Sequence, residues 1–163
     1  MRGLPALWLR SKLVSVSMAA PAGISFSSMT IAFRHLELSL MQERFAISRL
    51  APTAPLPAWA TQGAFYSVTR TCDEISIVVE EFRVPAGTQS QPGWRVFKIR
   101  GPFALSEVGV MASLTAPLAD ASISLFVIST FDTDYLLVTQ EQLASAIATL
   151  ERAGHTIHRS ENE

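Results

Sequence analysis

The chain has 163 residues, of which 48% are hydrophobic and 17% are charged, and its formal net charge is −1. This length fits one domain or two small fused ones, and the composition is too apolar for a disordered protein. A nearly neutral chain has no overall electrostatic field to hold nucleic acid or an anionic membrane, so we expect neither as a partner.

The N-terminal residues differ from the rest of the chain. Residues 1–28 are rich in Ser, carry basic residues and contain no acid. Arg10 and Lys12 interrupt their apolar run, which excludes a transmembrane helix of about 20 apolar residues and makes a poor secretory signal. Met29 lies just before the first regular pattern, so we expect residues 1–28 to be a disordered leader or an overextended start, with a transit peptide as the alternative.

Residues 29–84 have a strand-rich pattern. Leu36, Leu38 and Leu40 alternate with polar residues, and a second alternation begins at Phe45. We expect strands over 36–40, 45–49, 64–71 and 74–82, with a short helical piece over 57–61. Residues 85–93 have the Pro, Gly, Ser and Gln content of an exposed linker, and we place a module boundary there.

Residues 94–158 predict a complete βαββαβ module. The expected elements are strands over 94–100, 122–129, 134–139 and 155–158 and helices over 106–121 and 140–153. The strand over 122–129 is rich in Ile, Leu, Phe and Val and is typical of a central strand buried on both faces. With right-handed crossovers, this order gives a four-stranded sheet with both helices on one face. Residues 159–163 are a short tail.

Three residues set the expected helix boundaries in this module. Ser106 is a natural N-cap for the first helix. Pro117 should bend that helix or end it early, because an interior proline removes a backbone hydrogen bond. Gly154 should terminate the second helix.

The two halves also align without gaps at an offset of 60 residues. This alignment pairs Val68 with Ile128, Thr69 with Ser129, Glu74 with Asp134 and Val78 with Val138. The helical connection is shorter in the first copy, which indicates a reduced version of the second module.

Two loops at one end of the predicted sheet should be neighbours and form a polar pocket. The loop over 101–109 offers backbone N–H groups at a helix N-terminus, which suit a carboxylate. The loop over 129–134 offers hydroxyls and the carboxylates of Asp132 and Asp134, and Glu107 adds a third acid. A free α-amino acid requires such donors beside such acceptors, and several acids favour a cationic side chain.

Each of these residues also has an ordinary structural explanation. Ser106 serves as a helix cap, and Glu107 suits the dipole of a first helical turn. Ser, Thr and Asp are common turn residues, and Gly109 suits close packing. The run over 129–134 nevertheless contains more polar groups than a tight turn needs, which favours a functional interpretation.

Catalytic and metal-binding patterns are weak. Asp132 and Asp134 alone do not specify a metal, and His155 and His158 should point to opposite faces of a strand. Cys72, the only cysteine, allows no intramolecular disulfide and has no histidine nearby in sequence. We therefore expect no enzymatic activity, no metal, no cofactor and a reducing compartment, the cytoplasm.

Some RNA-binding modules share the βαββαβ order and stack bases on aromatic residues of their central strands. Phe97 and Tyr135 are the candidates for such a role. Their surroundings are acidic and apolar, which disfavours nucleic-acid binding.

Several motifs resemble those of ACT-domain proteins, in particular the bacterial tandem-ACT proteins similar to the CASTOR arginine-sensor family. The motifs are residues 75–78, 93–94, 101–102, 109, 117–119 and 154–155 and, above all, residues 128–138, Ile-Ser-Thr-Phe-Asp-Thr-Asp-Tyr-Leu-Leu-Val. The resemblance covers residues 36–157. It implies an α+β fold of two ferredoxin-like ACT modules side by side, the first with a reduced helical connection.

The resemblance further implies amino-acid binding at an interface between modules or subunits. By motif it points to Glu107, Val108, Gly109, Ser129, Thr130, Phe131 and Asp134, and the loop chemistry adds Ser106 and Asp132. This chain has two modules where the animal sensors have four, so a comparable interface implies a homodimer. We expect a non-catalytic sensor that signals to an unidentified downstream protein; the alternative is a ligand-free assembly module.

Overall fold

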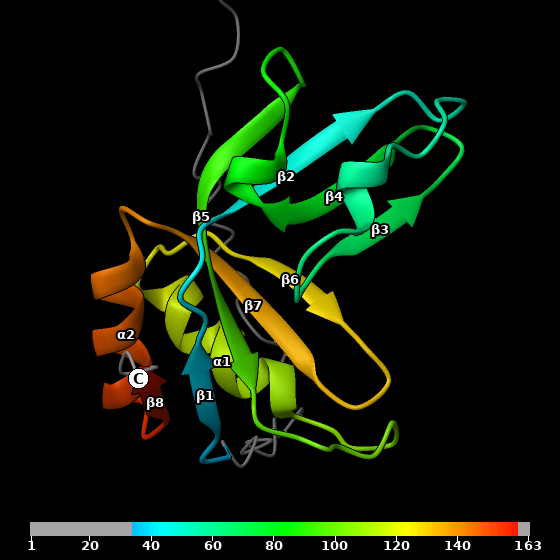
Figure 1. Ribbon diagram of the computed structural model, residues 1–163. Coiled ribbons are helices and arrows are strands. Elements are labelled where there is room, and N and C mark those ends of the chain that lie inside the picture. The colour runs from blue at the N-terminus through cyan, green and yellow to red at the C-terminus, as the bar shows by residue number, and fades with distance from the viewer. Residues whose placement is uncertain (1–33, 160–163) are drawn as a thin grey trace, which may run out of the picture. The chain divides into compact units, whose positions relative to one another are not determined.

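The computed structural model describes residues 34–159, where eight strands form one hydrogen-bonded sheet accompanied by two α-helices (Figure 1). The expected leader lies outside the described residues. In chain order the elements are β1 (Glu37–Leu40), β2 (Phe45–Leu50), the 3-10 helix η1 (Ala58–Thr61), β3 (Ser67–Arg70), β4 (Ile75–Glu80), the 3-10 helix η2 (Glu81–Arg83), β5 (Ser90–Ile99), α1 (Val110–Asp120), β6 (Phe126–Ser129), β7 (Asp134–Thr139), α2 (Leu143–Arg152) and β8 (Thr156–Arg159).

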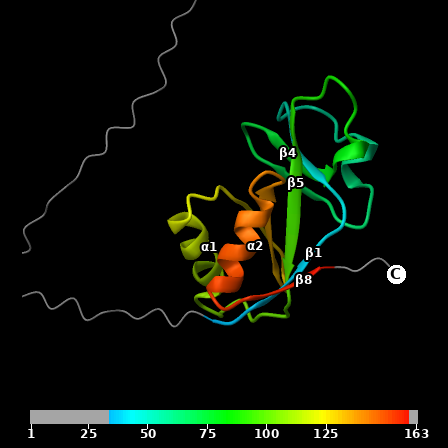
Figure 2. The ribbon, with the colours of Figure 1, turned by 90° about the vertical axis from the view of Figure 1, so that its left-hand side faces the viewer.

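The elements from β5 to β8 follow the expected βαββαβ order. Strand β7 lies between β6 and β5 and pairs antiparallel with both. Both helices cover one face of this part of the sheet, as Figure 2 shows. The α+β, ferredoxin-like fold predicted from the sequence is therefore confirmed.

The expectation of a four-stranded sheet in this module is wrong, because β1 is inserted as a fifth strand. It pairs antiparallel with β5 and parallel with β8. Its residues Leu38 and Leu40 are buried in the core beneath the helices. The alternating pattern of these leucines identifies a strand with one buried face, but it does not specify which sheet provides the partners.

The first half also has the strand order of a ferredoxin-like module, β3-β4-β2-β5, with every pair antiparallel. The helix positions are occupied by η1 and η2, so both connections are reduced within the described residues. The helical piece expected over 57–61 is η1, which Pro57 precedes.

Strand β5 belongs to both halves. Its first residues pair with β2, and its later residues pair with β1 along the same edge. The linker expected over 85–93 is therefore wrong for its last four residues, because β5 begins at Ser90. Pro92 and Gly93 lie where the β2–β5 register shifts, and such irregular positions accommodate residues that resemble a loop in the sequence.

The predicted repeat is present as two similar hairpins, β3–β4 and β6–β7, but the offset of 60 is wrong by one residue. The pair Arg70–Ile75 closes the first hairpin and Ser129–Asp134 closes the second, which is an offset of 59 residues. A shift of one residue in a strand exchanges the two faces of the sheet. Asp134 therefore corresponds to Ile75 and not to Glu74.

Apolar clusters cover both faces of the ACT-like sheet, which explains a second difference from expectation. One cluster lies under the helices, and another joins Phe45 and Val78 of the first half to Val96 and Leu137. The apolar run over 122–129 is not a central strand. Its strand portion, β6, pairs only with β7 among the described residues. The run is apolar because each face contacts a different cluster.

Helix α1 begins later than expected, at Val110, so Ser106 is not its N-cap. The N-cap is Gly109, which has a φ of 87°. Glycine adopts this left-handed conformation without the steric penalty of a Cβ. The loop before α1 can therefore turn sharply into the helix.

Pro117 does not end α1 early, since the helix continues to Asp120. The proline has no N–H to donate to the carbonyl of Ser113. That carbonyl instead accepts a hydrogen bond from Nε2 of the buried His155, at 3.0 Å. Nδ1 of His155 accepts the N–H of Leu36 at 3.3 Å, so the neutral ring links α1 to the segment before β1. His155 is thus a buried residue that precedes β8, whereas the sequence analysis placed it within the last strand.

Acidification is expected to destabilise the protein through His155. Burial lowers the pKa of its imidazole, although the hydrogen bond to Ser113 acts in the opposite direction. The unfolded chain therefore binds the proton more readily. This contribution to stability is complete above the ordinary histidine pKa of about 6.5 and is lost as the pH falls through the lowered folded value.

Urea unfolding at about pH 8 and about pH 5 measures this effect. In His155→Gln, the free energy of unfolding should depend less on pH than it does in the wild type. His158→Gln, which alters an exposed histidine beside Glu37, should retain the dependence that His155 causes. An unchanged pH dependence in His155→Gln would contradict the assignment.

Candidate functional site

A cavity of about 300 Å³ lies between the loop that precedes α1 and the loop that joins β6 to β7. Its lining comes entirely from one stretch of the chain, between Phe103 and Asp134. The size is at the lower end of the range of ligand pockets. The cavity can therefore hold a small molecule.

Two hydrogen bonds hold the two loops together, and a glycine allows their backbones to approach closely. The N–H of Phe103 donates to the carbonyl of Asp132 at 2.9 Å. The hydroxyl of the buried Thr133 donates to the carbonyl of Ile99 at 2.5 Å. At Gly101, a Cβ atom would lie only 2.6 Å from the carbonyl oxygen of Asp132. The cavity therefore depends on a close backbone approach that only glycine permits.

The N-terminus of α1 forms one wall of the cavity, through Gly109 and the first residues of the helix. The N–H of Ser113 is the first to bond within the helix, to the carbonyl of Gly109 at 2.9 Å. Helical geometry leaves the N–H groups of the preceding turn without intrahelical acceptors. This wall suits a carboxylate, since both the N–H groups and the helix dipole favour negative charge.

Carboxylates supply the opposite charge. Glu107, Asp132 and Asp134 all line the cavity, and no Lys, Arg or His is among the described residues that line it. Glu107 forms an ion pair with Arg34, which lies outside the cavity. Within residues 34–159, no side-chain hydrogen bond or ion pair engages the carboxylates of Asp132 and Asp134. Two acids are thus available to a cation.

Seven of the nine predicted site residues line this cavity. Ser106 and Val108 do not, and the side chain of Val108 is largely exposed. Sequence reasoning missed the apolar lining residues Phe103, Val110 and Met111, for which nothing but their position in or beside the loop was available. It also missed Arg34, because no local pattern connects residues so far apart in the chain.

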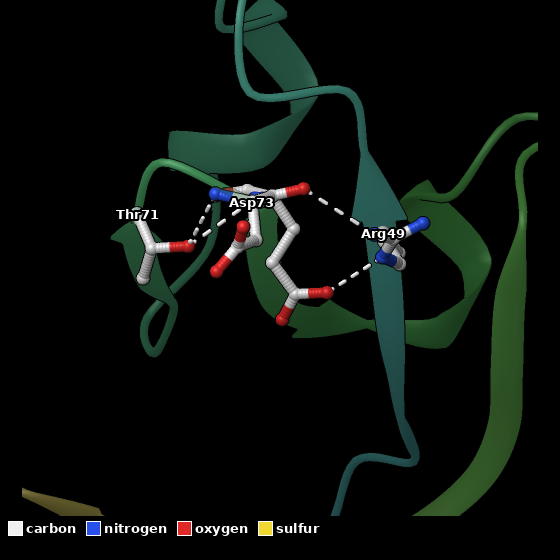
Figure 3. Close-up of polar contacts among 4 residues, drawn as sticks. Arg49, Thr71 and Asp73 are labelled. Atoms are coloured by element: carbon white, nitrogen blue, oxygen red, sulfur yellow. Dashed lines mark hydrogen bonds and ion pairs between the residues drawn. The ribbon is translucent and has the colours of Figure 1, made fainter.

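The matching hairpin of the first half is different (Figure 3). The Thr71 hydroxyl accepts the N–H groups of Asp73 and Glu74 at 3.1 and 3.2 Å. The Glu74 carboxylate accepts a hydrogen bond from Arg49 at 2.6 Å. Thr130 makes the equivalent turn contact with Thr133 in the second hairpin. The first hairpin therefore repeats the turn, but its Glu74 carboxylate is already paired with an arginine of its own module.

Metal binding finds little support in the described part of the chain. No group of three or more His, Cys, Asp and Glu side chains gathers there in a way that could hold an ion. Over the same residues, neither α-helix is long and apolar enough to cross a bilayer.

Comparison with known proteins places the chain in a family. A family model described as an ACT domain matches residues 89–152, and a second model, of an N-terminal domain, matches residues 43–87. The human "Putative protein CASTOR3P" is 30% identical over 121 residues, which cover 64% of this chain and 74% of that protein. The chain belongs to the ACT-domain proteins similar to the CASTOR family.

Within this family, a segment of 60 residues is 42% identical to the human "Cytosolic arginine sensor for mTORC1 subunit 1". The match covers 36% of this ACT-domain protein but only 18% of the sensor, so the chain spans less than a fifth of that relative. The solved structure of protein Atu0741 from Agobacterium tumefaciens is 39% identical, with a TM-score of 0.75. That likeness covers 80% of this chain and 97% of the other.

The regulatory subunit of aspartate kinase from Thermus flavus has the same fold at 12% identity. Its TM-score is 0.53, and the match covers 71% of this ACT-domain protein and 95% of the subunit. At this identity the likeness concerns the fold alone.

Proposed function

We propose that this ACT-domain protein is a cytoplasmic, non-catalytic sensor that binds a free amino acid, preferably with a cationic side chain, in the cavity beside α1. The observation that carries the proposal is the pairing of a helix N-terminus with three acids around one small cavity. The helix wall suits the ligand's carboxylate, and the acids suit its ammonium and cationic groups. No cofactor is part of the proposal.

The relatives support the same ligand class. A segment of 60 residues is 42% identical to a protein named a cytosolic arginine sensor. The name also supports a cytoplasmic location. Arginine is therefore the first ligand to test.

We propose that a second copy of the chain covers the cavity in a homodimer. Three large apolar side chains in the two cavity loops are exposed: Leu105, Val108 and Phe131. Exposed apolar side chains grouped beside a pocket are typical of an interaction site. Among the described residues, the first half contributes none to the cavity lining, and a partner subunit seated on these side chains would supply a cover. A change in the dimer interface on ligand binding would then be transmitted to a downstream protein.

The second candidate function is a ligand-free assembly module, which the same exposed apolar side chains favour. Nucleic-acid binding receives no support, because Phe97 is fully buried and the Tyr135 ring contacts Phe65, with centroids 4.5 Å apart. Neither ring is available as a platform for base stacking.

Thermal unfolding of the full chain with each proteinogenic amino acid tests the proposal. A ligand that binds the native state raises its stability by RT ln(1 + [L]/Kd), so arginine or lysine should raise the unfolding temperature. Sedimentation velocity on the same samples measures the oligomeric state. A stable dimer that responds to no amino acid would favour the assembly module and overturn the sensor.

A further inference from the structure

Arg34 is anchored at the same end of α1 as the cavity. Its N–H donates to the Ser113 hydroxyl at 3.1 Å, and that hydroxyl donates to the Gly109 carbonyl at 2.8 Å. From this position the Arg34 guanidinium reaches Glu107 and forms an ion pair with its carboxylate. The chain thus brings a cation of its own to an acid of the cavity.

The pair is not a simple surface contact. The Glu107 side chain is 23% exposed and lines the cavity, whereas the Arg34 side chain is 47% exposed and lies outside it. Glu107 is therefore both a lining residue of the cavity and the ion-pair partner of Arg34. A ligand cation near Glu107 must share this carboxylate with the guanidinium or replace it, since the single negative charge of a carboxylate cannot neutralise two cations.

We propose that Arg34 is an internal counter-ion that competes with the ligand's cation for Glu107 and so sets how strongly the cavity prefers cationic over neutral amino acids. The inference rests on the proposed function, because it assumes that an amino acid occupies the cavity. It adds a specificity-determining residue that does not line the cavity itself. Removing the Arg34 charge leaves the three cavity acids without an ion-pair partner among residues 34–159.

Arg100 provides a matched control. It forms an ion pair of the same kind with Glu37, at 2.6 Å, and lies near Phe103 as Arg34 does. Glu37 does not line the cavity beside α1. Arg100→Gln therefore removes one surface arginine and one ion pair without changing the charge balance at Glu107.

Calorimetry with arginine and with citrulline, its uncharged analogue of nearly equal shape, tests the inference. In Arg34→Gln, arginine should bind about two- to fivefold tighter relative to citrulline, since partly exposed ion pairs have free energies of this order. Arg34→Lys keeps the charge and should resemble the wild type, as should Arg100→Gln. This increase in the affinity for arginine relative to citrulline should vanish in the double variant Arg34→Gln/Glu107→Gln, because Arg34 and the ligand compete for the Glu107 carboxylate.

Two results would contradict the inference in different ways. If the wild type binds arginine and Arg34→Gln binds it equally or more weakly, Arg34 only holds Glu107 in place and is not a competitor. If neither protein binds any amino acid, the proposed function fails as well. Circular dichroism of each variant verifies that it is folded.

Discussion

Asp134→Ala is expected to abolish amino-acid binding while leaving the fold intact. Asp134 is the first residue of β7, and its position is fixed by backbone pairing with Ser129. Its side chain lines the cavity and has no hydrogen-bond or ion-pair partner among the described residues. Its carboxylate is therefore free to accept hydrogen bonds from a ligand, and the backbone alone holds the residue in place.

The expected effect on affinity is large. Truncating one partner of a buried, charged hydrogen-bonded pair costs about 2–5 kcal/mol, which corresponds to at least about 30-fold weaker binding. Stability should change by no more than about 0.5 kcal/mol, since the carboxylate has no hydrogen bond or ion pair to lose among the described residues. Calorimetry with arginine and urea unfolding measure the two quantities separately.

Asp73→Ala is the matched control for this variant, because Asp73 lies in the equivalent turn of the first hairpin, outside the cavity. It should bind as the wild type does. Wild-type affinity in Asp134→Ala would remove Asp134 from the site and would weaken the proposed orientation of the ligand.

Gly101→Ala should damage both the fold and the cavity. The added Cβ would lie 2.6 Å from the Asp132 carbonyl oxygen and 3.2 Å from Cβ of Thr133. A backbone atom cannot move aside as the end of a flexible side chain can, so the two loops must move apart. This movement should strain the hydrogen bond from the Phe103 N–H to the Asp132 carbonyl. Overpacking of this kind costs about 1–3 kcal/mol, and we expect ligand binding to be lost with it.

Gly87→Ala distinguishes a general loss of stability from damage to the cavity. Gly87 has a φ of 85° with open space at its Cβ position, so alanine there costs about 1–2 kcal/mol of backbone strain at a residue that does not line the cavity. That variant should be less stable but bind normally. Urea unfolding and calorimetry on both variants give the comparison, and normal binding in Gly101→Ala would show that the loops tolerate separation.

Local features of this protein could be predicted from the sequence with good accuracy. The βαββαβ order of the second half follows from hydrophobic periodicity, and Gly154 ends α2 with a φ of 94°, as expected for a C-terminal glycine. The polar loops that line the cavity were also predicted, because helix and strand ends in such a module must meet at one edge. That they bind a ligand stays a prediction.

Errors arose where the outcome depends on distant parts of the chain. The proline and glycine of residues 85–93 suggested a linker, whereas pairing with β2 makes the last four of them part of β5. The apolar strand near residue 126 suggested a central position, but β6 is apolar on both faces because the first half packs on the side opposite the helices.

The sequence by itself thus determined the elements of the second half and the chemistry of its loops, since periodicity, glycine positions and residue type act over a few neighbouring residues. The tertiary structure alone decided that β1 lies between β5 and β8 and that Arg34 pairs with Glu107. Both depend on contacts between segments more than 50 residues apart. The alternating pattern of a strand is the same whichever strand it pairs with. The residues around an arginine likewise do not indicate which carboxylate will be its ion-pair partner.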